Sequence, residues 1–368
     1  MIALRCGTTT AYAPCALQAM RTRERRAALH LITIYAPVLM AGVDQHVLEI
    51  RKIVRPELEV PSVTSAVSHA LLRPSVCVPD GGIVLSVVNK HHARLRPVQF
   101  HFIRHRPCFM RRVVSVCFSN MTDSFGKCIT STFTVPPSDF RRSNYANLIW
   151  AKWRIIIDAL ACPAAKMALW LDADVLILRN PWSALGLLGP QATDGPNFDI
   201  RFQSEGPPTA EQADPCTPPL PIGSLESRLN GGQLLVTSAM LASHIYGARP
   251  RNLSNTDRLD QDWADALLYN VSRFSYLLEN ASYAHEPRRR YSSCILPSTF
   301  VAECWNNPKF VHGKLGRSKG IKLLHGSLGC QAASHHFNCV PTRRLKGSMM
   351  KDLVTSWSTK CGNKTAYE

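Results

Sequence analysis

Acidic residues, paired cysteine motifs and repeats are scarce or missing in this sequence. Only 26 Asp and Glu stand against 43 Lys and Arg in 368 residues, which gives a formal net charge of +17. No C-x-x-C pair occurs, which argues against a zinc ribbon or a thioredoxin-type redox site. No internal repeat of about 20 to 50 residues is found, which argues against a solenoid or a propeller. Charged residues make up only 19% and hydrophobic residues 45%, so the composition predicts a folded chain with a sizeable core.

The length and the positive charge set broad limits on the protein. A chain of 368 residues predicts one large domain with appendages, or two lobes. The charge permits attraction to phosphates, acidic glycans or anionic lipid surfaces, without choosing among them. Thirteen cysteines indicate an oxidising compartment. Eleven of them follow Cys6 and Cys15, and because that number is odd, at least one thiol stays free or pairs between chains.

The N-terminal region resembles a membrane-directed segment. A basic cluster at 21–26 precedes the stretch 27–43, which contains no Asp, Glu, Lys or Arg. At about 1.5 Å per residue this stretch is at the short end of what spans a bilayer and long for a signal-peptide core. A single-pass signal anchor with a lumenal body is the favoured interpretation, because basic flanks stay in the cytosol. A cleaved signal peptide ending near Ala41 and an organellar transit peptide are the alternatives.

Potential glycosylation sites agree with a lumenal location. Five N-x-S/T sequons lie downstream of the apolar stretch and none lies before it. The expected location is therefore the Golgi or ER membrane with a lumenal catalytic domain, the alternatives being a secreted or organellar protein. The sequons are at Asn120, Asn252, Asn270, Asn280 and Asn363.

Strands and helices alternate along the body of the chain, which predicts a layered α/β domain. Residues 44–79 show no sustained helical period and carry several prolines, which predicts a stem or linker. Buried strands are expected at 83–89, 113–118, 167–171 and 175–178, with a short strand at 198–203. Apolar residues at helical spacing predict a helix from Asn144 that stops at Pro163, and 91–105 could form a shorter one that Pro97 restricts. The remainder of 186–228 is expected to be a long surface loop.

Two carboxylates interrupt an apolar run that is otherwise expected to be buried. In Leu169-Trp-Leu-Asp-Ala-Asp-Val-Leu-Ile-Leu178 they follow the end of a predicted strand. Buried unpaired carboxylates are costly, and this spacing can aim both side chains at one point, as a divalent cation with oxygen ligands requires. The alternative is a purely structural role, in which the two acids at the strand end cap a turn or pair with Arg. The context favours a metal site at Asp172 and Asp174.

Several blocks together resemble the nucleotide-diphospho-sugar transferases, the D-x-D glycosyltransferases of the GT-A fold. The first is the helix before the D-x-D strand, followed by Ala168-Leu-Trp-Leu-Asp-Ala-Asp-Val-Leu-Ile-Leu-Arg-Asn-Pro181. The others keep the order of the family and cover most of the chain from 83 to about 345: 198–205, Leu229-Asn-Gly-Gly-Gln-Leu-Leu-Val236, Leu259-Asp-Gln-Asp262 and Ile321-Lys-Leu-Leu-His-Gly-Ser-Leu-Gly329. The pattern is nearest the retaining branches.

The resemblance implies a fold, an activity and a cofactor. The fold is a GT-A-like, Rossmann-like mixed and mainly parallel sheet flanked by helices, preceded by the anchor and stem. The activity is transfer of a sugar, by a hexosyl- or pentosyltransferase, from a nucleotide-sugar donor to a glycan or glycoprotein acceptor. The cofactor is Mn²⁺, or Mg²⁺, bound to the diphosphate of the donor. Partners are the donor, the acceptor and, through the N-terminal segment, the membrane, with no nucleic acid. The predicted boundaries are 1–26 tail, 27–43 anchor or signal peptide, 44–80 stem, 81–350 catalytic domain and 351–368 tail.

The same resemblance assigns the metal and donor contacts. Asp172 and Asp174 would hold the metal together with His325. The alternative for His325 is a solvated or hydrogen-bonded histidine without a ligand role. Lys152 lies on the apolar stripe of its helix and would touch phosphate or sugar, or else extend to solvent. Asn230 could read sugar hydroxyls and Gly231 could allow close approach of a ligand, although Asn-Gly is first of all a turn signal.

The remaining candidate residues carry open alternatives. Asp260 and Gln261 could orient the donor or acceptor, or Asp260 could be the N-cap of a helix. His335 and His336 lie near two cysteines, but the spacing is unusual for zinc, and a disulfide between Cys330 and Cys339 or no role is preferred. The basic clusters at 104–112, 288–290 and 343–346 are expected to be solvated, and some could bind anionic nucleotide, lipid headgroups or acidic glycans.

Two other functions compete with the transferase. A haloacid-dehalogenase-type phosphohydrolase also carries D-x-D after a strand, with Asp172 as nucleophile and the second Asp as acid and base. That fold needs a further acidic pair downstream, and no Asp-Asp dipeptide follows residue 174. A non-enzymatic basic protein that binds membrane or nucleic acid would explain the charge but leaves the two acids without a purpose.

Overall fold

The computed structural model describes about half of the predicted catalytic body. The described residues are 62–88, 93–118, 122–123, 126–130, 145–188, 198–204, 229–247, 264, 293–295, 301–303, 332–337 and 343–361. None of the helices in these ranges is both long enough and apolar enough to cross a bilayer. The predicted anchor at 27–43 lies outside the described residues.

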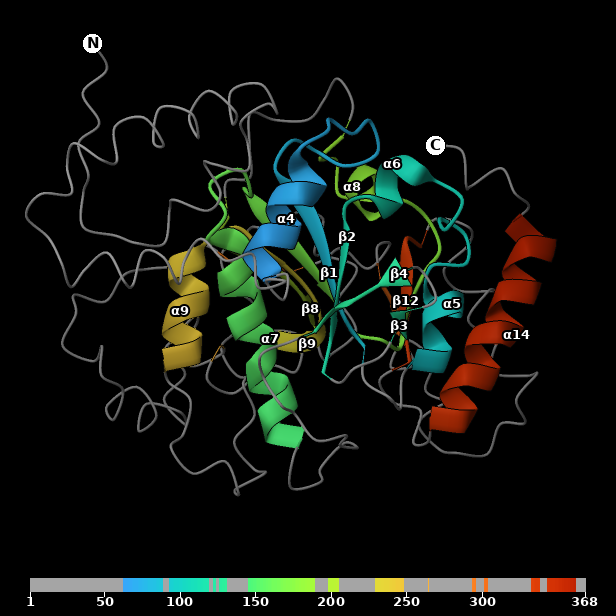
Figure 1. Ribbon diagram of the computed structural model, residues 1–368. Coiled ribbons are helices and arrows are strands. Elements are labelled where there is room, and N and C mark those ends of the chain that lie inside the picture. Colours follow the sequence, from blue (N-terminus) through green and yellow to red (C-terminus); the bar gives the residue numbers. More distant parts are fainter. Residues whose placement is uncertain are drawn as a thin grey trace, which may run out of the picture.

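A seven-stranded mixed sheet forms the centre of the molecule (Figure 1). Strand β1 (Gly82–Val88) pairs in parallel with β2 (Val113–Cys117) and β6 (Met167–Leu171). Strand β9 (Leu229–Val236) is antiparallel to both β6 and β8 (Ile200–Ser204). The prediction of a mixed, mainly parallel sheet flanked by helices is confirmed. The strand order is β10 (Ser293–Ile295), β8 (Ile200–Ser204), β9 (Leu229–Val236), β6 (Met167–Leu171), β1 (Gly82–Val88), β2 (Val113–Cys117) and β5 (Ile129–Thr130).

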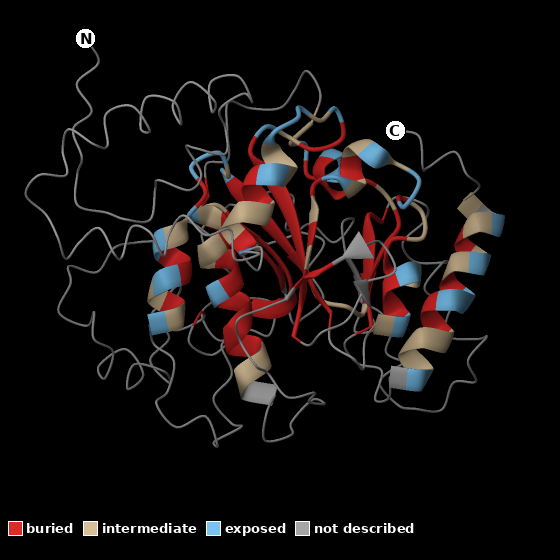
Figure 2. Ribbon diagram, viewed as in Figure 1, coloured by how far each residue is buried: buried red, intermediate tan, exposed pale blue. Residues whose placement is uncertain are grey.

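Alternate residues of the central strands face two different hydrophobic cores. In β6, Ala168 and Trp170 join one core, whereas Leu169 and Leu171 join the other. The first core is closed by α4 (Val63–Leu71), α7 (Tyr145–Leu160) and α9 (Ala239–Gly247), which lie together on one side of the sheet (Figure 1). The second is closed by α6 (Pro107–Met110), β7 (Val175–Ile177) and α8 (Pro181–Ala184). Both faces are therefore covered, and the central strands β1, β6 and β9 are buried throughout (Figure 2).

Helix α7 confirms the helix predicted before Pro163. Its buried face includes Trp150, Trp153 and Ile156, each 0% exposed. On the other face Arg154 Nε lies 2.9 Å from Asp158 Oδ1, one turn away. The possible helix at 91–105 is much shorter than that range, because Pro97 lacks a backbone donor. It consists of the 3₁₀ turn η1 (Ala93–Leu95) and the single turn α5 (Arg96–Gln99).

A second sheet and the last helix complete the described fold. Strand β12 (Ser334–His336) runs antiparallel to β7 and parallel to β11 (Val301–Glu303). Helix α14 (Arg343–Cys361) contributes Met350, Leu353 and Trp357 to a third hydrophobic cluster with β7. Strands β3 (Thr122–Asp123) and β4 (Gly126–Lys127) form a small hairpin. The C-terminal segments thereby lie beside the turn between β6 and β7.

Two predicted boundaries need correction. The predicted stem at 44–80 includes α4, whose Val63 and Val67 belong to the main core and whose N-cap is Ser62. Nine residues are too few to show a sustained helical period, so the pattern was missed. The predicted end at 350 falls inside α14, which continues to Cys361 because both halves of the helix bury apolar side chains.

Two disulfides that join pairs of described cysteines connect neighbouring parts of the fold. Cys77 pairs with Cys108, which ties the segment after α4 to α6. Cys117 pairs with Cys128, which ties the end of β2 to the residue before β5. The preferred pairing of Cys330 with Cys339 lies outside the described residues.

Candidate metal centre

The turn between β6 and β7 carries both acids of the D-x-D motif. The Asp172 N–H donates to the Gly232 carbonyl at 2.9 Å, and the Val175 N–H donates to the Asp172 carbonyl at 3.1 Å. Gln99 Nε2 also donates to the Asp172 carbonyl, at 2.8 Å. This backbone anchoring fixes the turn at the carboxyl end of β6, where α/β sheets bind ligands.

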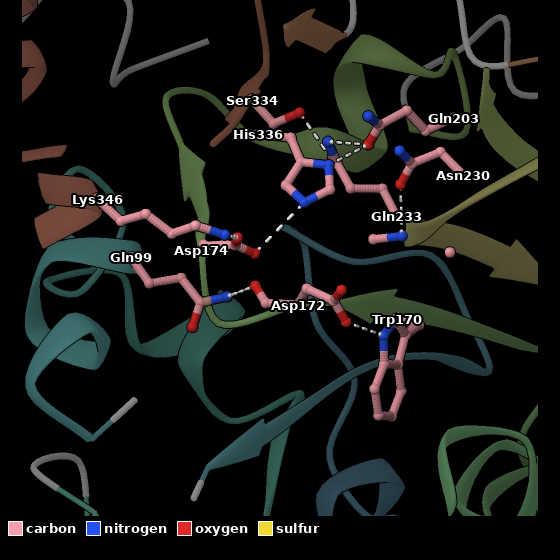
Figure 3. A network of polar contacts seen from close by, with 12 residues as sticks. Gln99, Trp170, Asp172, Asp174, Gln203, Asn230, Gln233, Ser334, His336 and Lys346 are labelled. Carbon is pink, nitrogen blue, oxygen red and sulfur yellow. Dashed lines mark hydrogen bonds and ion pairs between the residues drawn. The ribbon is translucent and has the colours of Figure 1, made fainter. Parts of the chain in front are cut away.

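Asp174 is held by two residues from the C-terminal part of the chain (Figure 3). His336 Nε2 lies 3.3 Å from Asp174 Oδ1, and Lys346 Nζ donates to Asp174 Oδ2. The Phe337 N–H donates to the Asp174 carbonyl at 3.1 Å. Burial alone would raise the pKa of the Asp174 carboxyl, but the charges of Lys346 and His336 outweigh burial and hold this pKa well below its usual range. Asp174 is therefore ionised.

Asp172 has a different environment, built from the sheet and α7. Trp170 Nε1 donates to Asp172 Oδ1 at 2.8 Å from two residues earlier in the chain. Burial raises the pKa of the Asp172 carboxyl, and the nearby Lys152 ammonium offsets this only in part. A carboxylate placed like this gains from an additional cation.

The two acids and His336 form a cluster suited to a metal ion. Their ligand atoms all lie within 4.8 Å of one another. Carboxylate oxygens suit Mg²⁺ and Mn²⁺, and imidazole suits Mn²⁺ better than Mg²⁺. The donor set therefore fits a divalent cation of the predicted kind.

The position of His336 depends on an unusual strand. Strand β9 pairs Asn230 with Gln203 and Leu234 with Phe202, so residues 231–233 form a bulge. A Cβ at Gly232 would lie 2.1 Å from His336 Cε1, so the ring occupies the space that a side chain would fill. Glycine is therefore needed at 232 because the His336 ring lies there. The expectation for the neighbouring Gly231 was close approach of a ligand.

Lys152 is buried, which excludes the alternative in which it extends to solvent. Its side chain is only 4% exposed, and Nζ donates to the Gly231 carbonyl at 3.2 Å. The ammonium also lies 5.7 Å from the centre of the Trp153 ring. Lys152 and Gly231, both predicted site residues, therefore meet beside Asp172.

The other predicted residues have mixed outcomes. Asn230 is buried, and its Oδ1 accepts a hydrogen bond from the Gly232 N–H at 2.9 Å, so it supports the bulge within β9 and does not begin a hairpin turn. Asp260, Gln261 and His325 lie outside the described residues.

His336 and Lys346 are the site residues that the sequence analysis missed. His336 had been given no role, and Lys346 belonged to a basic cluster expected to be solvated. Arg344 of that cluster is indeed exposed, but Lys346 contacts Asp174. The signal that was present for His336 is alternation: in β12, Ser334 and His336 share one face, while His335 packs edge-on against Phe337.

The comparisons with known proteins gave matches among solved structures. No protein-family profile and no curated protein matches the sequence. A glycosyltransferase involved in the glycosylation of the major capsid of PBCV-1 is 14% identical over 73% of this chain and 98% of that chain, with a TM-score of 0.41. The galactosyltransferase LgtC, solved with donor and acceptor sugar analogs, is 14% identical over 74% and 95%, with a TM-score of 0.33. Mouse xyloside xylosyltransferase 1 is 12% identical over 71% and 98%, with a TM-score of 0.34.

Proposed function

We propose that this protein is a metal-dependent glycosyltransferase that moves a sugar from a nucleotide-diphosphate sugar to a glycan or glycoprotein acceptor. The observation that carries the proposal is the cluster of Asp172, Asp174 and His336 at the carboxyl end of β6. The ordered motifs of the sequence support it, because they resemble those of nucleotide-diphospho-sugar transferases. On the same resemblance, the donor sugar is a hexose or a pentose and the reaction retains the anomeric configuration.

In this proposal, each residue of the centre has a part in binding or orientation. Asp172, Asp174 and His336 hold Mn²⁺, or Mg²⁺, with the imidazole favouring Mn²⁺. The cation supplies Lewis-acid stabilisation of the negative charge that develops on the departing nucleoside diphosphate. Lys152 adds a buried positive charge beside Asp172 and helps to orient the donor. Asp260 and Gln261 stay as the proposed orienting residues for donor or acceptor, on the resemblance alone.

The phosphohydrolase alternative fits the site less well. In that mechanism the first acid attacks phosphorus and the second donates a proton to the leaving group. A proton donor needs a pKa near the working pH, but Lys346 and His336 hold the pKa of Asp174 well below its usual range, against the effect of burial. The ionised Asp174 is suited to bind a cation.

The proposed compartment is the lumen of the Golgi or ER, with the N-terminal segment as a membrane anchor. The disulfides Cys77–Cys108 and Cys117–Cys128 support an oxidising environment. The sequons downstream of residue 43 also support it. Treatment of the full chain with a glycosidase that removes N-linked glycans should increase its mobility on a gel. An unchanged mobility contradicts the lumenal location.

Transfer and donor-hydrolysis assays across UDP- and GDP-sugars test the activity. We expect turnover of one donor that depends on Mn²⁺ and is abolished by a chelator. Asp172→Asn and Asp174→Asn should each lower turnover by at least about a hundredfold, since both are proposed to hold the cation that stabilises the leaving group. Asp80→Asn is the matched control, because Asp80 also pairs with a lysine, Lys166, but on the surface. Full activity in either site variant contradicts the proposal.

The identity of the histidine ligand is a separate question with a direct test. The sequence motifs favour His325, whereas His336 lies beside Asp174. Mn²⁺ affinity of His325→Gln and His336→Gln, measured by electron paramagnetic resonance of the free ion, distinguishes them. We expect the larger loss for His336→Gln. A loss only for His325→Gln would remove His336 from the centre.

A further inference from the structure

A chain of buried polar side chains holds the ring of His336 (Figure 3). Ser334 Oγ donates to Gln233 Oε1 at 2.8 Å, and Gln233 Nε2 donates to Gln203 Oε1 at 3.2 Å. Gln203 Oε1 in turn lies 2.9 Å from His336 Nδ1. These four residues are between 0% and 3% exposed, so water does not replace the contacts, and each polar atom depends on its protein partner.

The direction of this chain determines which nitrogen of His336 carries the proton. An amide oxygen only accepts hydrogen bonds, so Gln203 Oε1 requires Nδ1 to be the donor. A neutral imidazole has a single N–H, and Nε2 is then left with its lone pair. Nε2 is the nitrogen that lies 3.3 Å from Asp174 Oδ1. In the charged imidazole a proton on Nε2 lies between these two atoms, and in the neutral form the lone pair and the carboxylate can share a cation instead.

We infer that Gln203 is a positioning residue: it accepts the Nδ1 proton of His336 and so fixes the tautomer whose Nε2 lone pair is directed to the proposed metal centre. The inference rests on the proposed function, since it assigns a purpose to that tautomer. Partners on the second nitrogen of a metal-binding histidine generally set its tautomer and orientation, and their loss lowers metal affinity.

The bulge in β9 explains how these residues come together. Gln203 pairs with Asn230, and the extra residues of β9 place Gln233 within reach of the Gln203 side chain. Gly232, in the same bulge, leaves room for the ring of His336. The bulge therefore provides both the relay and the space for the ring that the relay orients.

Two substitutions at Gln203 separate positioning from structural support. Gln203→Met removes the acceptor oxygen with little change in length, whereas Gln203→Glu keeps an acceptor oxygen for Nδ1–H. Thr64→Val is the control, because it also removes a side-chain hydrogen bond, from Thr64 Oγ1 to the Asp158 carbonyl, but on α4 and away from the turn. The readouts are the histidine tautomers, from ¹⁵N spectra of metal-free protein above the titration range of histidine, and the affinity for Mn²⁺ alone. Comparison with His336→Gln identifies the His336 signal among 13 histidines.

We expect the Nδ1–H tautomer for His336 in the wild type, in Gln203→Glu and in Thr64→Val. In Gln203→Met we expect the Nε2–H form to appear and the affinity for Mn²⁺ to fall about tenfold. Gln203→Glu should bind Mn²⁺ nearly as tightly as the wild type. An Nε2–H tautomer in the wild type, or an unchanged tautomer in Gln203→Met, overturns the inference and leaves the proposed function intact. A wild type with the Nδ1–H tautomer that binds no Mn²⁺ instead contradicts the metal centre and the function proposed from it.

Discussion

The two acids of the turn between β6 and β7 are near neighbours in the chain but differ in what surrounds them. Asp172 is bound by Trp170 and lies near Lys152, residues that come from β6 and α7. Asp174 is bound by His336 and Lys346, residues that come from β12 and α14. Burial raises the pKa of Asp172, whereas the two C-terminal partners overcome burial and lower the pKa of Asp174.

This difference shows that one short motif can hold two carboxylates with different tasks. Asp174 is ionised by its protein partners and is ready to bind a cation. At Asp172 the charge of Lys152 offsets only part of the effect of burial on the pKa, so this carboxylate gains more from a bound cation. The proposed metal centre therefore combines a preformed anion with one that the metal would help to ionise.

The largest expected effect concerns stability at the two acids. Asp174→Asn should lower the free energy of unfolding by about 2 kcal/mol at neutral pH, because it leaves Lys346 without its carboxylate in a mostly buried site. Asp172→Asn should raise it slightly or leave it within about 1 kcal/mol, because a carboxylate with a raised pKa destabilises the fold when ionised. Urea unfolding of metal-free protein measures both.

The charges of Asp174 and Asp172 should change the free energy of unfolding in opposite directions as the pH changes. The pKa of Asp174 is depressed on folding, so its stabilisation is present above the unfolded value, about 3.9, and is lost as pH falls toward the folded value. The pKa of Asp172 is raised on folding, so the penalty for its charge develops as pH rises above the unfolded value through the folded one. Equal losses for both variants at every pH would remove the distinction between the acids.

A methyl group at Gly232 should disturb the Asp174 end of the turn more than the Asp172 end. The new Cβ would overlap the His336 ring, which must move or force the bulge to open. We expect Gly232→Ala to lower the free energy of unfolding by about 1 to 2 kcal/mol. We also expect it to weaken Mn²⁺ binding about tenfold. Gly347→Ala is the control, since its Cβ would meet only the end of the Leu95 side chain, at 3.2 Å. Wild-type Mn²⁺ affinity in Gly232→Ala contradicts the assigned position of His336.

Lys346 should compete with a divalent cation for Asp174. Its ammonium contacts Oδ2 of this carboxylate, so Lys346→Met removes a positive charge that opposes a metal ion. The expected result is an affinity for Mn²⁺ that rises by about tenfold, which corresponds to about 1.4 kcal/mol. Lys351→Met, on the exposed side of the same helix, should leave the affinity unchanged. A weaker affinity in Lys346→Met would mean that the lysine assembles the site.

The smallest expected effect compares a surface pair with the buried one. Lys166 Nζ lies 2.7 Å from Asp80 Oδ2, but these side chains are 61% and 88% exposed. Asp80→Asn should change the free energy of unfolding by less than about 0.5 kcal/mol, because solvent screens the pair. A loss as large as that of Asp174→Asn would show that burial is not what makes the Asp174 pair matter.

The parts of the site that were predictable are those carried by local pattern. The apolar run before Asp172 identified a buried strand, and two acids at its end identified the centre of the site. Lys152 was recognisable because a lysine on the apolar stripe of α7 needs a polar partner, and it has one in the Gly231 carbonyl. Helix α4 was missed since it is short, and α14 was cut because its apolar positions are mixed with many polar ones.

The parts that were not predictable depend on contacts between distant segments. His336 lies 162 positions after Asp174 and Lys346 lies 172 after it, and no local pattern marks either as its partner. The contact of His336 with Asp174 depends on the antiparallel register of β12 on β7, which sets His336 opposite Val175. The contact of Lys346 with Asp174 depends on the packing of α14 against β7.

The alternation of strands and helices, the buried strand β6 and the pair of acids after it can all be inferred from the amino-acid sequence. Periodicity and the cost of burying charge act over a few residues and are visible in the sequence. The opposite pKa shifts of Asp172 and Asp174 and the contact of Gln203 with His336 follow from the folded arrangement. Electrostatic and hydrogen-bond energies depend on distance in space, and for residues far apart in the chain the fold sets that distance.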